Sequence, residues 1–247
     1  MDRMLYVAMS GAKQTMLAQA ANNHNLANSN TVGFKADLLA MQNRAVDGPG
    51  YASRVYATDG SIGWDNGEGA LMTTGNPLDV AVRGQGWIAV QDASGNEAYT
   101  RAGDLHVDAN GQLQTATGLS VLGDNGPIAL PPYTTVTVGG DGTISIVPQG
   151  SPVNTVSSVA QIKLVNPGTA ALQRGADGLF RTTDGQPANA DANVKLASGV
   201  LEASNVDLAD AMVNMIDLSR HYELQIKALH SADENAQSAT KLLSNNG

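Results

Sequence analysis

Residues 205–243 have apolar side chains at alternating spacings of three and four, the pattern of an amphipathic helix with a heptad seam. No proline or glycine occurs between Asn205 and Asn246, and Asn205 and Asp207 are both suitable N-caps. At about 1.5 Å per residue, the predicted helix is about 55 Å long, and its apolar side requires a partner along most of that length. The alternative is that the helix packs across its own domain. The predicted seam consists of Met212, Met215, Ser219, Tyr222, Ile226, Leu229, Asp233, Ala236, Thr240 and Leu243.

A second amphipathic helix is predicted near the N-terminus, over residues 4–28. Its apolar face consists largely of alanine and methionine, and these small or adaptable side chains allow another helix to approach closely. Gly11 weakens the helix by about 1 kcal/mol relative to alanine. The alternative is an ordinary amphipathic helix that packs on its own core. The predicted face contains Leu5, Met9, Ala12, Met16 and Ala20, and it is widened by Ala8, Leu17 and Ala21.

Between these helices the sequence changes to short apolar runs separated by turn residues such as Asp59-Gly60 and Asn66-Gly67. Residues 36–70 are predicted to form an extended β-hairpin arm or a linker, and residues 71–204 a small all-β barrel or sandwich. The predicted fold class is therefore α+β. In this fold the N- and C-terminal helices, in residues 1–35 and 205–247, pair as a coiled-coil-like hairpin beside a central all-β domain.

The composition narrows the possible functions. Only 15% of the 247 residues are charged and the formal net charge is -9, which argues against binding to nucleic acid or to an anionic membrane surface. The absence of cysteine excludes disulfides and thiolate chemistry. We expect no signal peptide, because the start lacks a continuous apolar run. We also expect no transmembrane helix, because no window holds roughly 18 apolar residues.

Three patterns could suggest a ligand site, and each is interpreted as structural. Residues 84–89, Gly-Gln-Gly-Trp-Ile-Ala, fit a dinucleotide-binding pattern, but a β-like run follows where such a site requires a helix. Asp104, Asp108 and Asn110 lack the glycine and glutamate positions of a calcium loop. His24 has no metal-binding or catalytic partner at a suitable spacing, and no catalytic serine, histidine or phosphate-binding lysine motif occurs. We therefore predict no enzymatic activity, cofactor, metal or small-molecule substrate.

Residues 22–35 are rich in asparagine, whose side chain competes for backbone hydrogen bonds and disfavours continuation of a helix. Gly33 can adopt a positive φ at the exit, so a structured change from helix to extended chain is predicted. The stretch resembles the Asn-Asn-Leu-Ala-Asn…Gly-Phe-Lys signature of the bacterial flagellar rod and hook proteins, with one departure at His24-Asn25. The motif positions are Asn22, Asn23, Leu26, Ala27, Asn28, Thr31, Gly33, Phe34 and Lys35.

Further blocks extend the resemblance over both ends of the chain and much of the β region. Residues 76–81 and 99–103 are similar to the opening of the family's β domain, and residues 199–207 and 220–223 are similar to its C-terminal signature. Gln225 departs from the family pattern, in which asparagine is frequent. The N-terminal residues and the chain length most resemble the proximal-rod members, and distal-rod or hook-type members are the alternatives.

The resemblance implies a structural subunit of the periplasmic flagellar rod, which transmits torque from motor to hook and assembles through its terminal helices. Its implied partners are other rod proteins, copies of itself and the flagellar type III export apparatus, which exports such subunits without signal cleavage. Independently, one helical pair cannot cover both apolar stripes, so head-to-tail contacts between chains are predicted. A soluble β binding module is the alternative from another class. The predicted assembly interface consists of Leu5, Met9, Ala12, Met16, Leu26, Met212, Met215, Tyr222, Ile226, Leu229, Ala236 and Leu243.

Overall fold

The chain forms two compact units in a computed structural model that describes residues 3–39, 42–45, 55–58, 62–152 and 155–244. The first, called the helical unit, contains residues 1–29, 35–65 and 206–247. The second, called the β unit, contains residues 30–34 and 66–205. The predicted motif of residues 22–35 therefore contributes its asparagine-rich part to the helical unit and its Gly33-Phe34 part to the β unit.

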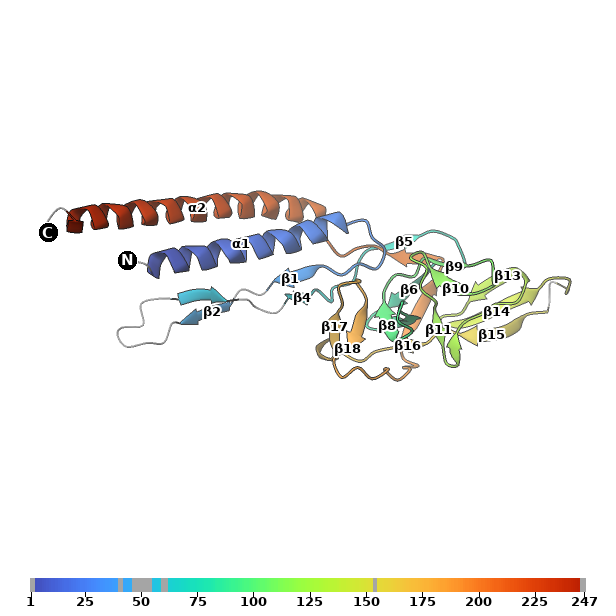
Figure 1. Cartoon of the computed structure of the whole chain (residues 1–247). Helices are drawn as coiled ribbons and strands as arrows, with labels where there is room; N and C mark the ends of the chain where they lie inside the picture. Colours follow the sequence, from blue (N-terminus) through green and yellow to red (C-terminus); the bar gives the residue numbers. More distant parts are fainter. Residues whose placement is uncertain (1–2, 40–41, 46–54, 59–61, 153–154, 245–247) are drawn as a thin grey trace. The chain divides into compact units, whose positions relative to one another are not determined.

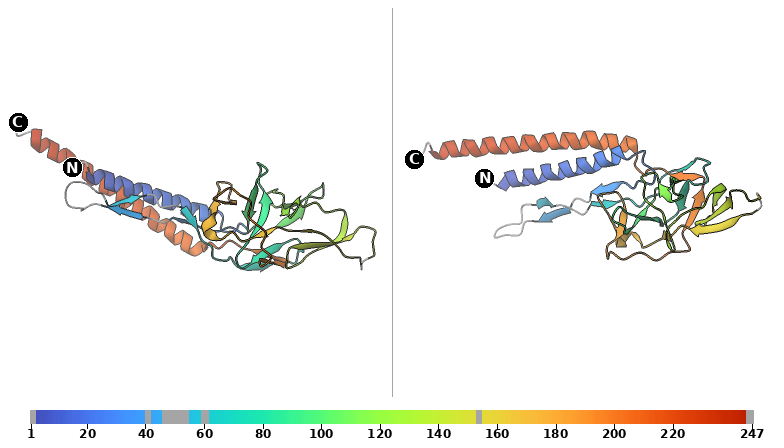
Figure 2. Two further views of the ribbon diagram at one scale, coloured as in Figure 1. Left: turned by 90° about the horizontal axis from the view of Figure 1, so that it is seen from below. Right: turned by 45° about the vertical axis from the view of Figure 1, so that its right-hand side comes forward.

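The helical unit contains two long helices, α1 (Arg3–Ala27) and α2 (Leu208–Ser244). They lie side by side in Figure 1 and in the right-hand view of Figure 2. Of the two predicted N-caps, Asn205 and Asp207, the second caps α2: Asp207 Oδ1 accepts hydrogen bonds from the N–H groups of Ala209 at 2.8 Å and Asp210 at 3.1 Å. Among the described residues, neither helix combines the length and the apolar character needed to cross a bilayer.

Two short antiparallel pairs complete the helical unit. β1 (Asp37–Leu39) pairs with β4 (Ile62–Trp64), and β2 (Gln42–Ala45) pairs with β3 (Val55–Thr58). The chain therefore runs out through β1 and β2 and returns through β3 and β4 (Figure 1). The predicted turns at residues 47–50 and 59–60 lie outside the described residues.

The β unit is built from antiparallel sheets, as the alternating and apolar runs predicted. Its largest sheet has the strand order β16-β7-β8-β18-β17. These strands are β7 (Trp87–Gln91), β8 (Glu97–Thr100), β16 (Leu164–Val165), β17 (Leu172–Arg174) and β18 (Phe180–Thr182), with a short 3-10 turn at Thr169–Ala171. A three-stranded sheet contains β13 (Tyr133–Val138), β14 (Thr143–Pro148) and β15 (Ser157–Gln161), in that order.

Four two-stranded pairs complete the β unit, and two of them join residues that are far apart in the sequence. β5 (Leu71–Thr73) pairs with β20 (Val200–Glu202), and β6 (Val80–Arg83) pairs with β19 (Lys195–Ser198), so both ends of the β segment are tied together. The other two pairs are local and consist of β9 (Leu105–Val107) with β10 (Leu113–Thr115), and β11 (Leu122–Gly123) with β12 (Gly126–Pro127).

The core of the β unit follows the strand periodicity. In β14, Ile144 and Ile146 are buried, while Thr143 and Ser145 between them are half-buried. Residues 84–86 form the turn between β6 and β7, so the Gly-x-Gly-x-x-Ala run leads into a strand and not into a helix, as predicted. A dinucleotide site of the Gly-x-Gly-x-x-Ala kind requires a helix that begins at these glycines, so the run has the structural role that the sequence indicated.

Arg181 on β18 links two loop carboxylates of the β unit. It donates hydrogen bonds to both oxygens of Asp177, and its Nη2 lies 2.8 Å from Asp92 Oδ2. The Arg181 hydrogen bonds hold the pKa values of Asp92 and Asp177 below the ordinary 3.8. A lowered carboxylate pKa contributes stability that is present above pH 3.8 and lost as the pH falls through the lower folded pKa.

Arg181→Gln is therefore expected to lower the free energy of unfolding of the β unit by about 1 kcal/mol at neutral pH, since the pairs are partly exposed. At about pH 2 we expect a smaller difference, because the stabilisation is lost as the pH falls below 3.8 and through the lowered pKa values of the folded native protein. Urea unfolding of the native protein and of Arg181→Gln, at neutral pH and at about pH 2, measures this difference in the free energy of unfolding. A difference that does not change with pH would contradict this origin of the stabilisation.

Candidate assembly site

Two contacts define how α1 and α2 pair. A Cβ atom added at Gly11 would lie 3.1 Å from the amide carbon of the Gln225 side chain, so the helices approach closely at this point. Farther along, Asn22 Nδ2 donates a hydrogen bond of 2.8 Å to the backbone C=O of Ala211. Residue numbers rise along α1 while they fall along α2, so the two helices are antiparallel.

The least exposed side of α2 differs from the predicted seam at Met212, Ser219 and Asp233, whereas Ile226 of the seam is half-buried. Met215, Tyr222 and Leu229 of the predicted seam are half-buried, but Met212 is 46% exposed and Asp233 is also exposed. Ser219 is exposed as well. The preceding residues take these three positions: Ala211, Leu218 and Ala232. Because a helix has 3.6 residues per turn, adjacent residues compete for each position, and at two of the three the smaller alanine is buried and allows the closer approach. Gln225, next to Ile226, is half-buried and keeps a polar residue on this side.

The predicted apolar face of α1 is divided between two sides. Ala12 is buried, together with Ala8, whereas Met9 and Met16 are 54% and 56% exposed and Ala20 is exposed. Alanine and methionine are both apolar, so periodicity alone does not distinguish the stripe that faces inward from the one beside it. Of the remaining predicted interface residues, Leu26 and Ile226 are half-buried, and the side chains of Leu5, Ala236 and Leu243 lie outside the described residues.

The helical unit leaves several large apolar side chains exposed, and we call them the exposed apolar set. Single exposed apolar residues are common on protein surfaces, but several on one pair of packed helices indicate a surface that another protein covers. The members are between 46% and 59% exposed: Met9, Met16, Leu38, Leu208, Met212, Val213, Ile216 and Leu224.

The asparagine-rich stretch connects the end of α1 to β1. Asn25 Oδ1 accepts a hydrogen bond of 2.7 Å from the N–H of Asp37, and Asn25 Nδ2 donates one of 3.0 Å to the C=O of the same residue. The side-chain amide therefore bonds to the strand edge as a neighbouring strand would. At the helix end, Asn28 Nδ2 donates to the C=O of His24, and Ser29 Oγ to that of Leu26, both at 2.9 Å. These bonds satisfy carbonyl groups that the end of a helix leaves open.

His24 has a partner that the sequence did not indicate. Its Nδ1 lies 2.6 Å from Asp37 Oδ2, and the Asp37 side chain is 12% exposed. The pair becomes visible only when the chain turns back after α1, because the two residues are not at a metal-ligand or helical spacing. Among the side chains that the structure describes, no three histidines or carboxylates gather as a metal site would require. His24 therefore links the end of α1 to β1 through Asp37.

Gly33 and Phe34 anchor the chain in the β unit. Gly33 has a φ of +67°, and its N–H donates a hydrogen bond of 2.8 Å to the C=O of Glu202. A Cβ atom at Gly33 would lie 2.2 Å from the carbonyl carbon of Arg101, so a side chain does not fit there. The ring of Phe34 is buried, with the Arg174 guanidinium 4.5 Å from its centroid. The motif glycine is thus required by both conformation and space.

Arg101 and Glu202 form a buried ion pair beside this anchor, and each side chain is only 1% exposed. Arg101 Nη1 lies 2.9 Å from Glu202 Oε2, and its Nη2 donates a hydrogen bond of 2.6 Å to the C=O of Gly84. The guanidinium also lies 5.4 Å from the centroid of Trp87. The other Glu202 oxygen accepts a hydrogen bond from the N–H of Gly69. Both charged residues occur in blocks that carry the family resemblance, but sequence reasoning did not pair them.

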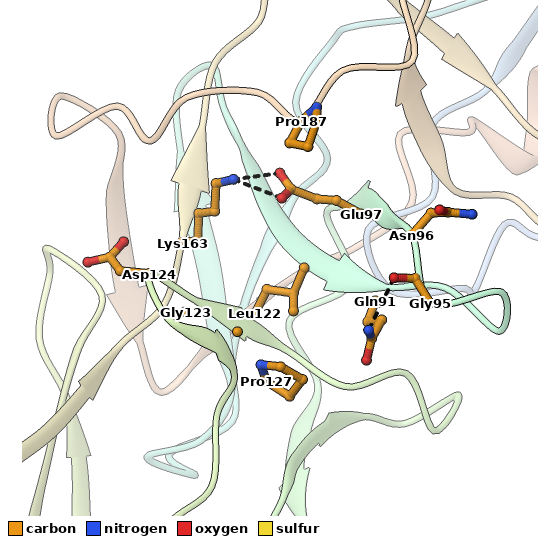
Figure 3. Close-up of a pocket in the computed structure, with 11 residues that line it drawn as sticks. Gln91, Gly95, Asn96, Glu97, Leu122, Gly123, Asp124, Pro127, Lys163 and Pro187 are labelled. Carbon is orange, nitrogen blue, oxygen red and sulfur yellow. Dashed lines mark hydrogen bonds and ion pairs between the residues drawn. The ribbon is translucent and has the colours of Figure 1, made fainter.

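The β unit has a cleft of about 460 Å³ with an ion pair at its edge (Figure 3). Lys163 Nζ points at the carboxylate of Glu97 and donates to both oxygens at 2.8 Å. The Tyr99 hydroxyl donates to the same carboxylate at 2.9 Å, and burial raises the pKa of Tyr99 to about 12. Glu97 on β8 is therefore held by Lys163 and Tyr99, which links β8 to the segment that precedes β16.

Three family models match the chain in sequence order. Residues 5–35 match "Flagella basal body rod protein", residues 81–146 match "Flagellar hook protein FlgE/F/G D1 domain", and residues 197–242 match "Flagellar basal body rod FlgEFG protein C-terminal". The first match contains nearly all of α1 with the asparagine-rich stretch, and the last match contains nearly all of α2. The middle match lies within the β unit and includes Arg101.

Individual relatives are similar over nearly the whole chain. The chain is 44% identical to "Flagellar basal-body rod protein FlgF" of Escherichia coli (strain K12), with 99% of each protein covered. It has the same identity and coverage with the protein of that name from Salmonella typhimurium. It is 30% identical to "Flagellar basal-body rod protein FlgG" of Bacillus subtilis (strain 168), covering 98% of this chain and 99% of the relative.

Proposed function

Because this chain belongs to the flagellar basal-body rod protein family, we propose that it is a structural subunit of the rod in the flagellar basal body. The observation that carries the proposal is the 44% identity to FlgF proteins along 99% of the chain. The lower identity of 30% to an FlgG protein favours the proximal rod over the distal rod. In this role the subunit transmits torque from the motor to the hook.

The subunit assembles into the rod through its terminal helices, which pair as a coiled-coil-like hairpin. The close approach at Gly11 and the hydrogen bond from Asn22 support this pairing. The exposed apolar set then remains for contacts with neighbouring subunits. The nested strands β1 to β4 form an extended β-hairpin arm beside the helices, in line with their antiparallel pairing.

The last turns of α2 are the part of the helical unit that most requires a neighbour. Continuing the antiparallel register past Gly11 and Gln225 brings Arg3 opposite the stretch around Asp233. The remainder of α2, to Ser244, extends past Arg3, as the ribbon in Figure 1 illustrates. An isolated stretch of helix this short has little stability in water, so we expect neighbouring subunits to hold it.

The partners in this proposal are other rod proteins, further copies of the chain and the flagellar type III export apparatus. The subunit reaches the periplasmic rod through that apparatus without signal cleavage. It requires no cofactor, metal or small-molecule substrate in this role.

A truncation after Ala232 tests the proposal. It removes the overhanging part of α2 but keeps the residues that contact α1 in the antiparallel register. We expect the truncated protein to retain the thermal unfolding of its β unit, and we expect its amount in isolated basal bodies and the swimming rate to fall at least tenfold.

The matched control is a truncation after Ser244, which leaves α2 complete and is expected to support normal swimming. If the protein that ends at Ala232 enters basal bodies and supports normal swimming, assembly through the overhanging helix is wrong. If the full-length protein itself is absent from basal bodies, the rod function is wrong.

A further inference from the structure

A groove of about 440 Å³ lies in the helical unit, lined by α1, β1 and α2. Ala18 and Ala21 of α1 are among its apolar lining, so a side chain from another molecule would find space there. Asp217 and His221 line it from α2, and Leu38, which is 53% exposed, lines it from β1. The groove is thus bordered by two long helices and one short strand.

The charge of the groove is negative. Asp37 and Asp217 are among its lining residues, and no lysine or arginine is among the described residues that line it. Asp37 is held in place by His24 and by the side chain of Asn25. Asp217 is exposed on α2. Two carboxylates beside apolar residues favour a ligand that carries a cation on an apolar surface.

The same helix carries such a surface on its outer side. Val213, Ile216 and Leu224 are between 52% and 59% exposed, and Arg220 and Lys227 are exposed among them. The five residues follow spacings of three and four, so they share one face of α2. This outer face points away from the buried positions Ala211 and Ala232, because about half a turn separates the two stripes.

We propose that the groove receives the outer face of α2 from a second copy of this chain, with Arg220 of that copy directed toward Asp217 and Asp37. This proposal rests on the proposed rod function and specifies its subunit contact. Charge complementarity identifies the occupant, since the acidic groove and the basic outer face are on the same chain. A contact of groove with groove would bring carboxylates together, and a contact of outer face with outer face would bring Arg220 and Lys227 together.

The two surfaces are different, so the contact is heterologous and each copy can use one surface toward each of two neighbours. Repetition of such a contact gives a ring or an open helical array. Asp217 belongs to the groove and Arg220 to the outer face, and both residues are on α2. The α2 helix of each copy therefore takes part in the contact with both neighbours. The groove contact therefore accounts for serial addition of identical subunits without requiring any change in the β unit.

Cysteine cross-linking tests the proposal, and the absence of native cysteine makes every introduced thiol unique. Leu38→Cys marks the groove and Leu224→Cys marks the outer face. In isolated basal bodies, we expect oxidation to yield cross-linked dimers and larger multimers from the double variant. We expect no cross-link from either single variant, because neither surface contacts its own equivalent. Val156→Cys, an exposed position in the β unit paired with Leu38→Cys, is the control and is expected to give no multimers.

Exchanging the charges of Asp217 and Arg220 tests the same contact independently. We expect Arg220→Asp to reduce the amount of protein in basal bodies at least tenfold, and the double variant Asp217→Arg with Arg220→Asp to restore most of it. Arg83→Asp, at an exposed position of β6, is the matched control and is expected to have no effect.

Each contrary result has a distinct meaning. Cross-linking of Leu224→Cys alone would show a symmetric contact and overturn the proposal. Basal bodies that contain the double cysteine variant but yield no multimers would also overturn it, while the rod function would stand. Absence of the native chain from basal bodies would overturn the rod function itself.

Discussion

Replacing Glu202 with leucine is expected to lower the free energy of unfolding of the β unit by about 3–5 kcal/mol. The substitution leaves the Arg101 guanidinium, which is 1% exposed, without its carboxylate partner in an interior that solvates charge poorly. It also removes the acceptor for the N–H of Gly69. Denaturant unfolding monitored by tryptophan fluorescence measures the loss, since Trp87 lies 5.4 Å from the Arg101 guanidinium carbon.

The double variant Arg101→Met with Glu202→Leu is the control for this prediction. It removes both charges together, so no unpaired ion remains, and we expect it to recover most of the lost stability. If the single and double variants are equally destabilised, the loss arises from packing or from the backbone contacts of Arg101. If Glu202→Leu has nearly the stability of the native protein, the ion pair does not hold the β unit together.

Gly33→Ala is expected to have the second large effect, on both stability and rod assembly. The left-handed conformation at φ +67° costs an alanine about 1–2 kcal/mol, and the added Cβ would lie 2.2 Å from the Arg101 carbonyl carbon. Backbone has to move to relieve that approach, which breaks the hydrogen bond from Gly33 to Glu202. We expect a total loss of at least about 3 kcal/mol, together with faster proteolysis of residues 30–34 and reduced swimming.

Gly75→Ala is the matched control, because Gly75 has a similar φ of +77° but nothing within 4 Å of an added Cβ. It is expected to cost only the conformational part, about 1–2 kcal/mol, and to leave swimming unchanged. The difference between the two variants measures the cost of the close approach to Arg101. Equal losses for Gly33→Ala and Gly75→Ala would contradict a specific role for that approach.

The helices illustrate what local sequence determines. The absence of proline and glycine between Asn205 and Asn246 and the two possible caps, Asn205 and Asp207, predicted the position of α2 closely, since helix propensity and capping act within a few residues. The β region was predicted for the same reason, from alternation and from turn residues. The side of α2 that is buried was predicted only in part, because Met212 and Ala211 are both apolar and only contact with α1 selects between them.

The site shows the complementary limit. The asparagine-rich stretch and Gly33 were recognised from the sequence, because turn chemistry and the family signature are local. Their partners were not, since Asp37 meets His24 only after the chain reverses. The pairing of Arg101 with Glu202 joins residues 101 positions apart. Periodicity and propensity act over a few residues, whereas these contacts depend on how the whole chain closes and packs, so only the tertiary structure decided them.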